Sequence, residues 1–466
     1  MQSLLEGVEV LRLRGDPART EITSITQDSR TVTPGALFCC LPGSQADGHD
    51  FASRAVTAGA SALLCERELP LDVSQAVVRD ARAAAGPVAA AFYGNPSRQL
   101  AVVGVTGTNG KTTTTHLVKA VLEADGRKTG VIGTLSGPRT TPEAIDLQAR
   151  LAEMVAGGSS AAAIEVSSHA LVQHRVSGTW FSVVAFTNLS PEHLDYHKTM
   201  DAYFEAKLAL FNPERAGLAV VNADDPWGRR LIEAAPMPIT PFSLADVSDI
   251  VLGPVSSTFV WDGHRVELQL GGSFNVANAV AAAAIGRALG VDSKAIAAGL
   301  STAPPVPGRV ETVGAGQPFL VIVDYAHTPA SLEQVLLSAR GAGKRVITVF
   351  GCGGDRDRTK RPAMGEVATR LSDVAILTSD NPRSEDPSAI IGEVRAGIGR
   401  SEVLVVEPDR RAAIANALAQ ARAGDVVVLA GKGHETVQLV GERSFPFDDR
   451  QVAREVLAEL KERAAW

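Results

Sequence analysis

A glycine-rich segment with a lysine and neighbouring threonines is the strongest chemical signal in this sequence. Residues 104–113 read GVTGTNGKTT, after an apolar run at 100–103 and before a helix predicted over 113–124. A strand, a glycine turn and a helix N-terminus in this order form a phosphate cradle, with backbone N–H groups around the anion. Lys111 would reach the outer phosphates, and a threonine hydroxyl would meet Mg²⁺. The segment therefore predicts a nucleotide site, and the expected nucleotide is ATP.

One position departs from the general pattern of such loops, G-x-x-x-x-G-K-[ST]. That pattern places glycine at position 105, where this chain has Val105, so the first glycine of the loop is Gly107. We interpret the segment as a shortened variant. A glycine turn without phosphate chemistry is the alternative, but the strand before the segment and the helix after it favour a phosphate site.

A carboxylate and an imidazole follow the next predicted strands. Glu165 ends the run AAAIE, and His193 lies in the segment NLSPEHLD after the following run. Because ligands of open parallel sheets bind beyond the carboxyl ends of the strands, both side chains are expected beside the triphosphate. Mg²⁺ prefers oxygen ligands, so Glu165 is the stronger candidate of the two. For His169 and His197, ordinary hydrogen-bonded roles are favoured.

A second group of polar side chains follows the predicted strands nearer the C-terminus. Glycines, acids and arginines occur in four loops, DYAHT at 324–328, GCGGDRDR at 351–358, SDNPR at 379–383 and GKGHE at 431–435. Arg356 and Arg383 could each clamp a carboxylate, and Asp380 or Glu435 could pair with an ammonium. This combination suits an amino acid, in particular one with an additional carboxylate. Surface salt bridges are the alternative, which four loops at corresponding strand ends disfavour.

An ATP site and an amino-acid site on separate blocks of the chain indicate a ligation reaction. ATP would phosphorylate a carboxylate, and an amine would attack the resulting acyl phosphate. Positioning of the reactants and neutralisation of charge would supply most of the rate, as in phosphoryl transfer generally.

Length and turn residues divide the chain into three predicted domains. The 466 residues suggest about three units of ~150 residues each. The segment YGNPS at 93–97 and the proline cluster at 304–308 are the expected linkers. The predicted domains therefore cover residues 1–98, 99–307 and 308–466.

The predicted fold class is α/β, with parallel sheets in the second and third domains. Continuous apolar runs that alternate with helical segments are typical of a parallel sheet covered on both faces. The alanine-rich stretches at 279–284 and 412–421 are expected to be packing faces of helices. The predicted strands are 100–103, 161–165, 183–187 and 218–222 in the second domain and 319–323, 346–350, 374–378, 403–406 and 426–430 in the third.

Composition excludes several classes of protein. The net charge of −7 argues against general binding to nucleic acid or membranes, and no run of 18 apolar residues occurs. Four cysteines without metal-ligand spacing fit reduced thiols. We therefore expect a cytoplasmic protein that acts on small molecules, as a monomer and without membrane insertion.

The motifs together resemble the Mur ligases, over essentially the whole chain. TGTNGKT at 106–112 resembles the phosphate loop of that family, which likewise lacks the first glycine of the general pattern. The resemblance is closest to members that add meso-2,6-diaminopimelate to the D-Glu of UDP-N-acetylmuramoyl-L-alanyl-D-glutamate in peptidoglycan precursor synthesis. It implies a UDP-substrate domain, a central P-loop ATPase domain and a C-terminal Rossmann-like domain that binds the amino acid, with ATP as co-substrate and Mg²⁺ as cofactor.

The resemblance also implies roles for individual residues around the nucleotide. Lys111, Glu165, His193 and Lys207 would be catalytic, and Lys207 looks like the lysine that family members carbamylate to obtain an anionic oxygen ligand. Thr112, Glu165, His193 and the carbamate of Lys207 would hold Mg²⁺. The residues implied to bind ATP are Gly107, Thr108, Asn109, Gly110, Lys111, Thr112, Thr113, Asn275, Arg309 and Asp324.

Two further sets follow from the same resemblance. Arg139 stands where some relatives have Asn, and Glu192 stands where Asp is common. The residues implied to bind the UDP-linked substrate are Ser29, Ser44, Gln45, Ala46, Thr140, Thr141, Ser167, Gln173 and Arg175. Those implied to bind diaminopimelate are Arg356, Asp380, Asn381, Pro382, Arg383, Gly431 and Glu435.

Arg383 is the residue on which the expected specificity depends. In the resembled family, an arginine at the end of the tetrapeptide DNPR accompanies diaminopimelate, and lysine-adding relatives differ there. Diaminopimelate differs from lysine by a distal carboxylate, which needs a cationic partner. Lysine would leave Arg383 unpaired and would therefore be rejected.

Two alternatives remain open at this point. The chain could add lysine or another amino acid, or resemble the related folylpolyglutamate synthases, although DNPR and the segment at 44–46 argue against both. It could also be a nucleotide-switched binding protein without ligase activity. Such a switch would not need two carboxylate-clamping arginines in a separate domain.

We predict that Arg383→Ala raises the KM for diaminopimelate selectively, because the variant loses the partner of the distal carboxylate. Steady-state kinetics with each substrate varied in turn would measure this, and the KM for ATP is expected to stay the same. An unchanged KM for diaminopimelate would contradict the assignment.

Overall fold

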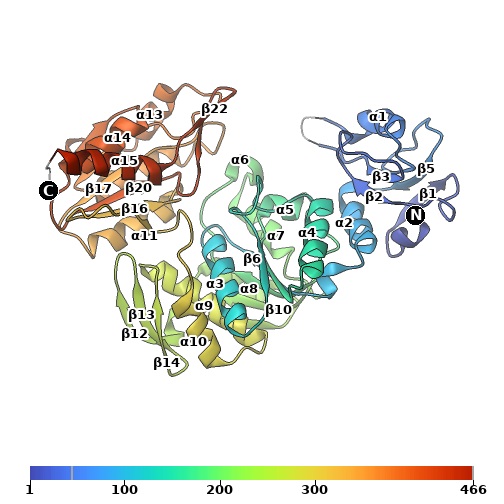
Figure 1. Ribbon diagram of the computed structural model, residues 1–466, viewed down its shortest axis with the longest axis horizontal. Helices are drawn as coiled ribbons and strands as arrows, with labels where there is room; N and C mark the ends of the chain where they lie inside the picture. Colours follow the sequence, from blue (N-terminus) through green and yellow to red (C-terminus); the bar gives the residue numbers. More distant parts are fainter. Residues whose placement is uncertain (44–45, 464–466) are drawn as a thin grey trace.

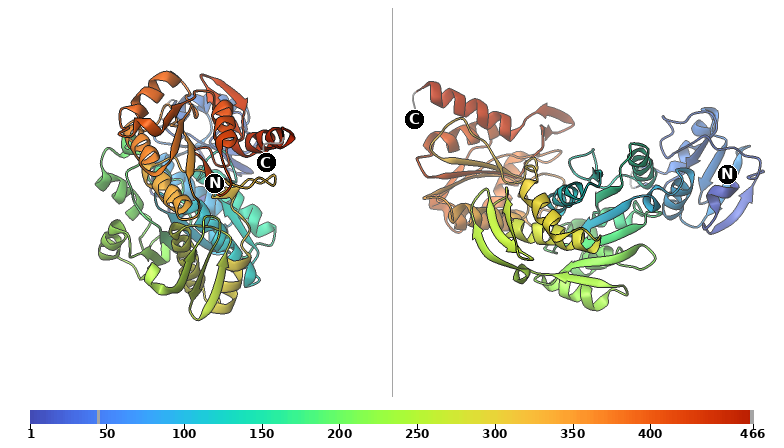
Figure 2. Two further views of the ribbon diagram at one scale, coloured as in Figure 1. Left: turned by 90° about the vertical axis from the view of Figure 1, so that its left-hand side faces the viewer. Right: turned by 60° about the horizontal axis from the view of Figure 1, so that its bottom comes forward.

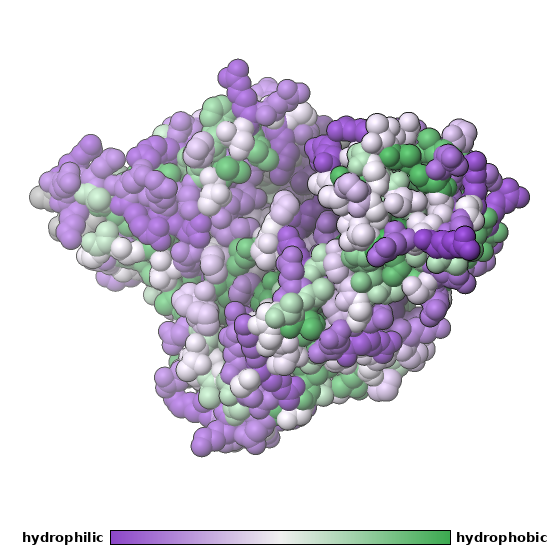
Figure 3. Space-filling view, turned by 45° about the vertical axis from the view of Figure 1, so that its right-hand side comes forward, coloured by the Kyte–Doolittle hydropathy of each residue, from purple (hydrophilic) through white to green (hydrophobic). Residues whose placement is uncertain are grey.

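Three α/β parts follow one another along the chain in the computed structural model, which describes residues 1–43 and 46–463. They lie in a row, with the N-terminal part at one end and the C-terminal part at the other (Figures 1 and 2). One face of the molecule carries intermixed hydrophilic and hydrophobic side chains (Figure 3). Within the described residues, no helix is both long and apolar enough to cross a membrane.

The N-terminal part is a five-stranded sheet with the strand order β1-β5-β4-β3-β2. Its strands are β1 (Val10–Arg14), β2 (Ser24–Thr26), β3 (Ala36–Cys39), β4 (Ala62–Cys65) and β5 (Ser74–Val78), with helices α1 (Ala52–Thr57) and α2 (Ala81–Phe92). Strand β1 pairs antiparallel to β5, and the other neighbours are parallel. The three cysteines of this part, Cys39, Cys40 and Cys65, are buried and free.

The central part contains a six-stranded parallel sheet in the order β11-β10-β9-β6-β8-β7. Its strands are β6 (Ala101–Thr106), β7 (Thr129–Ile132), β8 (Ala161–Glu165), β9 (Phe181–Phe186), β10 (Ala216–Asn222) and β11 (Ile239–Phe242). Its helices are α3 (Lys111–Ala124), α4 (Ala144–Ala156), α5 (Ser168–Val172), α6 (Leu194–His197), α7 (Met200–Leu208), α8 (Pro226–Ala234), α9 (Ser273–Ala288) and α10 (Ser293–Thr302).

Two apolar cores cover the two faces of the central sheet. Leu117 of α3, Val280 of α9 and Ile296 of α10 are buried in one core, and Leu151 of α4 and Phe204 of α7 are buried in the other. The alanines of 279–284 belong to or pack against the first core, which confirms their predicted role as a packing face.

The sequence reasoning missed a three-stranded antiparallel sheet between the central and C-terminal parallel sheets. Its strands are β12 (Val247–Leu252), β13 (Ser257–Trp261) and β14 (His264–Leu268). In β13 and β14 buried and more exposed residues alternate, so Phe259, Trp261 and Val266 reach the core beside α9 and α10. This period-2 pattern was a usable signal.

The C-terminal part is a six-stranded sheet in the order β15-β16-β20-β17-β18-β19, parallel except for β15. Its strands are β15 (Glu311–Thr312), β16 (Leu320–Asp324), β17 (Val346–Phe350), β18 (Val374–Leu377), β19 (Leu404–Val406) and β20 (Val426–Ala430), and β21 (Val437–Val440) and β22 (Arg443–Pro446) form a hairpin. Its helices are α11 (Pro329–Arg340), α12 (Arg361–Leu371), α13 (Pro387–Arg395), α14 (Arg410–Gln420) and α15 (Asp449–Glu462).

Helices cover both faces of this sheet, as predicted. Leu336 of α11 and Met364 of α12 are buried in the core on one face, and Ile414 of α14 and Leu457 of α15 are buried on the other. The predicted α/β fold class with parallel sheets is confirmed. The predicted domain boundaries at 98/99 and 307/308 fall between elements and stay a prediction.

The predicted element ends were wrong by one to three residues in several places. Helix α3 begins at Lys111 rather than at 113, because Gly110 takes the left-handed conformation with φ +88° and turns the chain directly into the helix. Strand β6 continues to Thr106 because this buried segment pairs with both neighbouring strands. At 403 the chain still belongs to a 3₁₀ turn, so β19 begins one residue later.

A buried ion pair fixes two helices to the carboxyl end of β20. The first residues of α14 and α15, Arg410 and Asp449, form a bidentate pair with Nε–Oδ1 and Nη2–Oδ2 distances of 2.8 and 2.6 Å. Arg410 Nη2 also donates to the carbonyl oxygen of Ala430, at 3.0 Å. Both side chains are fully buried. Removal of one partner would therefore leave an uncompensated charge in the protein interior.

We predict that Asp449→Ala destabilises the C-terminal part by about 3–5 kcal/mol, the cost of orphaning a buried charge. The chain offers a matched control, because Glu455 of α15 pairs with the neighbouring Arg411 at the surface. Glu455→Ala should cost less than about 1 kcal/mol. Thermal unfolding followed by circular dichroism would compare the two variants, and equal midpoints would contradict the prediction.

Candidate active site

A cleft between the central and C-terminal parts contains two adjoining pockets. Asn109, Gly110, Arg309 and Tyr325 line both pockets. The carboxyl ends of β6, β8, β16, β17, β18 and β20 all face this cleft, through the residues that follow them. These residues follow the carboxyl ends of their strands, which is where ligands of open parallel sheets bind.

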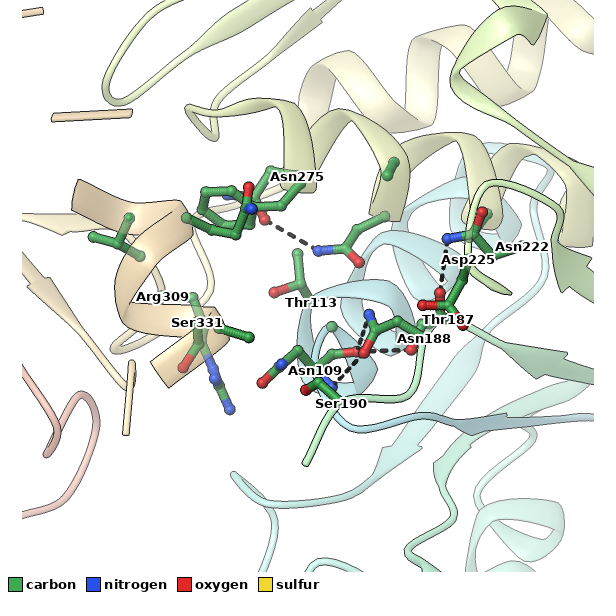
Figure 4. Close-up of a pocket in the computed structure, with 18 of the residues that line it drawn as sticks. Asn109, Thr113, Thr187, Asn188, Ser190, Asn222, Asp225, Asn275, Arg309 and Ser331 are labelled. Atoms are coloured by element: carbon green, nitrogen blue, oxygen red, sulfur yellow. Dashed lines mark hydrogen bonds between the residues drawn. The ribbon is translucent and has the colours of Figure 1, made fainter. Parts of the chain in front are cut away.

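The first pocket combines amide side chains with an apolar wall (Figure 4). Asn275 of α9, Thr113 of α3, Arg309 and Ser331 of α11 all line it. Asn278 of α9 also belongs to the lining. Phe274, Ala281 and Val335 supply apolar surface. Asp324, at the end of β16, is buried, and its burial raises the pKa of its carboxyl group. A pocket that combines apolar walls with polar side chains suits a nucleoside, which has an apolar base face and polar edges.

The phosphate loop joins the first pocket to the second. A Cβ atom at Gly107 would lie 1.9 Å from Thr187 Oγ1, and one at Gly110 would lie 2.3 Å from Asn278 Oδ1, so both positions require glycine. Lys111 Nζ donates to the carbonyl oxygens of Gly107 and Thr108, at 2.9 and 2.8 Å. Burial lowers the pKa of Lys111. The side chain of Lys111 thus folds back over the phosphate loop, where an anion would bind.

Glu165 lies at the base of the second pocket and is fully buried. Its Oε2 accepts a hydrogen bond from Thr112 Oγ1 at 2.9 Å, and its Oε1 accepts one from the backbone N–H of Thr134 at 2.8 Å. From the C-terminal part, Arg309 Nη2 donates to Thr112 Oγ1 at 3.1 Å. Carboxylate and hydroxyl oxygens beside a phosphate loop are the ligands that Mg²⁺ prefers, so Glu165 and Thr112 fit that ion.

His193 lines this side of the site, and Lys207 contacts the phosphate loop from outside both pockets. His193 takes a left-handed backbone conformation with φ +58° and lines the second pocket. Burial lowers its pKa to about 4, so the imidazole is neutral near pH 7 and keeps a lone pair for a metal. Lys207 Nζ donates to the carbonyl oxygen of Gly107 at 3.0 Å. Burial, with Lys111 nearby, holds the pKa of Lys207 well below its ordinary value.

His169 and His197, for which the sequence favoured ordinary hydrogen-bonded roles, do not line the two pockets. His197 is hydrogen-bonded to Ser168, with 2.9 Å between Nε2 and Oγ, as expected. The ring of His169 lies edge-on to that of His193, with 4.6 Å between centroids. Within the described residues, no group of three or more His, Cys, Asp and Glu side chains is arranged to hold a metal ion.

The second pocket also collects the amino-acid-binding candidates. Arg356, Asp380, Asn381, Arg383, Gly431 and Glu435 all line it, together with Thr140 and Ser167 of the central part. Pro382 is absent from this lining. A Cβ atom at Gly354 would lie 1.9 Å from the carbonyl oxygen of Pro382, so the backbone at Pro382 packs closely against the preceding loop.

Arg383 is fixed by its backbone as well as by its side chain. Its φ is +52°, its N–H donates to the carbonyl oxygen of Leu439 at 3.0 Å, and its Nη1 donates to that of Gly354 at 2.6 Å. Burial and the neighbouring Arg356 lower its pKa. Two arginines that repel each other in one pocket are stabilised by an anion between them.

Lys432 is a site residue that sequence reasoning missed. Its buried ammonium donates to Asn381 Oδ1 and Glu435 Oε2, both at 3.2 Å, and to the carbonyl oxygen of Val437 at 2.6 Å. Glu435 Oε2 also accepts from Asn381 Nδ2 at 2.7 Å. A lysine between two glycines after a buried strand was the available signal. Lys432 holds two of the predicted ligand-binding side chains in place.

The UDP-substrate candidates are spread over the junction of the N-terminal and central parts. Thr141 Oγ1 donates to the carbonyl oxygen of Glu165 at 2.7 Å, and Arg175 bridges the carbonyl of Thr141 and Gln173 Oε1. Ser29 and Ala46 lie in the N-terminal part, outside both pockets. Ser44 and Gln45 lie outside the described residues.

One carboxylate at this junction is shared by three arginines. Glu143 lies within 3.1 Å of Arg82, within 2.7 Å of Arg139 and within 3.0 Å of Arg175. Arg82 comes from α2 of the N-terminal part, so the cluster ties the two parts together.

Comparison with known proteins identifies the family. "Mur ligase family, catalytic domain" matches residues 21–95, "Mur ligase middle domain" matches 105–286, and "Mur ligase, glutamate ligase domain" matches 308–433. The chain belongs to the Mur ligase family. The three matches follow the order of the N-terminal, central and C-terminal parts, and the phosphate loop lies in the central one.

Similar Mur ligases cover nearly the whole chain. UDP-N-acetylmuramoyl-L-alanyl-D-glutamate--2,6-diaminopimelate ligase of Geobacillus kaustophilus is 47% identical over 95% of this chain and 96% of its own length. The enzyme of the same name from Streptomyces avermitilis is also 47% identical, over 95% of this chain and 93% of its own length. A solved structure of a ligase of this name has a TM-score of 0.69 at 33% identity, covering 98% of this chain and 99% of that one.

We predict that Lys432→Met lowers stability by about 1–3 kcal/mol, because methionine fills the space but cannot donate the charged hydrogen bonds that Lys432 gives to Asn381 and Glu435. Lys344→Met is the control, since Lys344 is exposed. Thermal unfolding would compare both variants with the wild type. A midpoint for Lys432→Met equal to that of the control would show that the ammonium does not hold Asn381 and Glu435.

Proposed function

We propose that this protein is the ATP-dependent ligase that joins meso-2,6-diaminopimelate to the D-Glu of UDP-N-acetylmuramoyl-L-alanyl-D-glutamate, in peptidoglycan precursor synthesis. The observation that carries the proposal is the shared pocket: the phosphate loop and Glu165 form one side, and Arg356 and Arg383 form the other. Two relatives that are 47% identical are ligases named for the same pair of substrates.

The first half-reaction is phosphoryl transfer to the substrate carboxylate. A carboxylate oxygen attacks the γ-phosphorus of ATP, the bond to the bridging oxygen breaks, and ADP leaves. Lys111 and Arg309 offset the negative charge that gathers where these groups meet. Thr112, Glu165 and His193 would hold Mg²⁺, which when bound neutralises charge on the phosphates.

The second half-reaction is attack by the amine on the acyl phosphate. The amine nitrogen forms the amide bond, the C–O bond to phosphate breaks, and inorganic phosphate and a proton are released. Arg383 and Arg356 hold the distal carboxylate, and Asp380 and Glu435 provide negative charge for the distal ammonium. When the amine is held beside the phosphate loop, its attack on the acyl phosphate becomes an effectively unimolecular step.

Lys207 is proposed to be carbamylated. Only a neutral amine reacts with CO₂, and the lowered pKa of Lys207 favours the neutral form. The carbamate would add an oxygen ligand for Mg²⁺ next to Gly107.

We expect Lys207→Ala to lose almost all activity, and short carboxylic acids to restore part of it by supplying the missing oxygen ligand. Phosphate release with and without added acid would measure both effects. Full activity without any added acid would contradict the carbamate.

The ligase itself is tested by phosphate release from ATP, Mg²⁺ and UDP-N-acetylmuramoyl-L-alanyl-D-glutamate, with meso-diaminopimelate compared with L-lysine. We expect release with diaminopimelate only. Release with lysine only would retain the ligase and reject the role of Arg383 in specificity. No release with either amine would reject the ligase.

We also propose a cytoplasmic location and a monomeric state. The four free, buried cysteines support a reducing compartment. Size-exclusion chromatography with light scattering would measure the mass.

A further inference from the structure

A hydrogen bond crosses the cleft between two residues that have no role in the reaction described above. Glu192 lies between β9 and α6 of the central part, and His327 lies between β16 and α11 of the C-terminal part. His327 Nε2 is 3.1 Å from Glu192 Oε1. Both residues line the second pocket, beside Lys111 on one side and Arg356 on the other.

Both ring nitrogens of His327 have a hydrogen-bond partner. Nδ1 lies 2.8 Å from the carbonyl oxygen of Tyr325, which accepts hydrogen bonds and cannot donate them, so Nδ1 is the donor. Nε2 lies 3.1 Å from Glu192 Oε1, on the other side of the cleft. The ring of His327 therefore joins its own part of the chain to the central part.

His327 is itself held rigidly on the C-terminal part. Lys360 Nζ donates to its carbonyl oxygen at 2.8 Å, and its ring lies 4.5 Å from that of Tyr325. The Arg309 guanidinium lies 4.7 Å from the same Tyr325 ring. Movement of His327 therefore moves the wall that carries Arg309.

The apolar contact between the same two parts lies elsewhere. Val255 and Phe274, from the antiparallel sheet region and α9, pack against the core that contains Leu336 of α11. The proline-rich connection at 304–307 links the two parts. A hydrogen bond at the reaction pocket, in addition to an apolar contact and a short connection, is placed to hold the cleft closed.

We propose that Glu192 and His327 form a hydrogen-bonded latch that keeps the amino-acid-binding part against the phosphate loop while the amine attacks. This inference rests on the proposed ligase function. His327 is then a positioning residue. A role as general base would need a free ring nitrogen, and both ring nitrogens of His327 are engaged.

The test is a double-mutant cycle with His327→Ala, Glu192→Gln and the double variant. We expect His327→Ala to lower kcat/KM for diaminopimelate by about 100-fold, the effect of slight misplacement of reacting groups. The single-turnover burst of ADP from ATP and the UDP-linked substrate, without the amine, should keep its amplitude. The double variant should be no worse than the poorer single variant, because both changes break one contact.

Several results would overturn the latch. These are a His327→Ala variant within twofold of the wild type, losses that multiply in the double variant, or an ADP burst lost together with amide formation. His264→Gln, on β14 and outside both pockets, is the control and should behave as wild type. If His327→Ala does not fold, His327→Gln replaces it in the cycle, with coupling to Glu192 as the readout.

The wild-type measurement separates this proposal from the proposed function. A wild type that releases no phosphate with either amine would reject the ligase whatever the variants do. An active wild type whose activity does not depend on the pair would reject the latch alone.

Discussion

The close packing of the phosphate loop at 107–112 against its neighbours constrains the rest of this structure. Gly107 and Gly110 have no room for a Cβ atom, because Thr187 and Asn278 occupy that space. These two neighbours come from the end of β9 and from α9, so the loop, the sheet and the long helix fix one another. Thr112 then points at Glu165 on the adjacent strand. The phosphate site is thus built from four elements at once.

Burial of charge is used differently on the two sides of the cleft. On the central side, Lys111 and Lys207 are buried near each other, and burial lowers the pKa of both. On the C-terminal side, the buried charges are compensated: Arg410 pairs with Asp449, and Lys432 pairs with Glu435 of the pocket. The first arrangement favours the arrival of an anion, and the second keeps the receiving side chains in place.

The fold class and most of the candidate site could be predicted from the sequence because both depend on local patterns. Apolar runs predicted the parallel strands, and the strand-end rule placed Glu165, Asp324 and Gly431 at the carboxyl ends of strands in their two sheets. The antiparallel strands β12–β14 were missed because they are not continuous apolar runs that alternate with helices. Helix α3 was predicted to begin too late because the conformation of Gly110, and not composition, decides its first residue.

By itself, the sequence determined the phosphate loop, the α/β class and the acids and arginines that follow the strands, since each is encoded within a few consecutive residues. Only the tertiary structure decided which of these side chains meet. Lys432 reaches Asn381 across 51 positions of sequence, and His327 meets Glu192 across 135. Spacing along the chain carries no record of such contacts, because they depend on how two separately folded sheets face each other across one cleft.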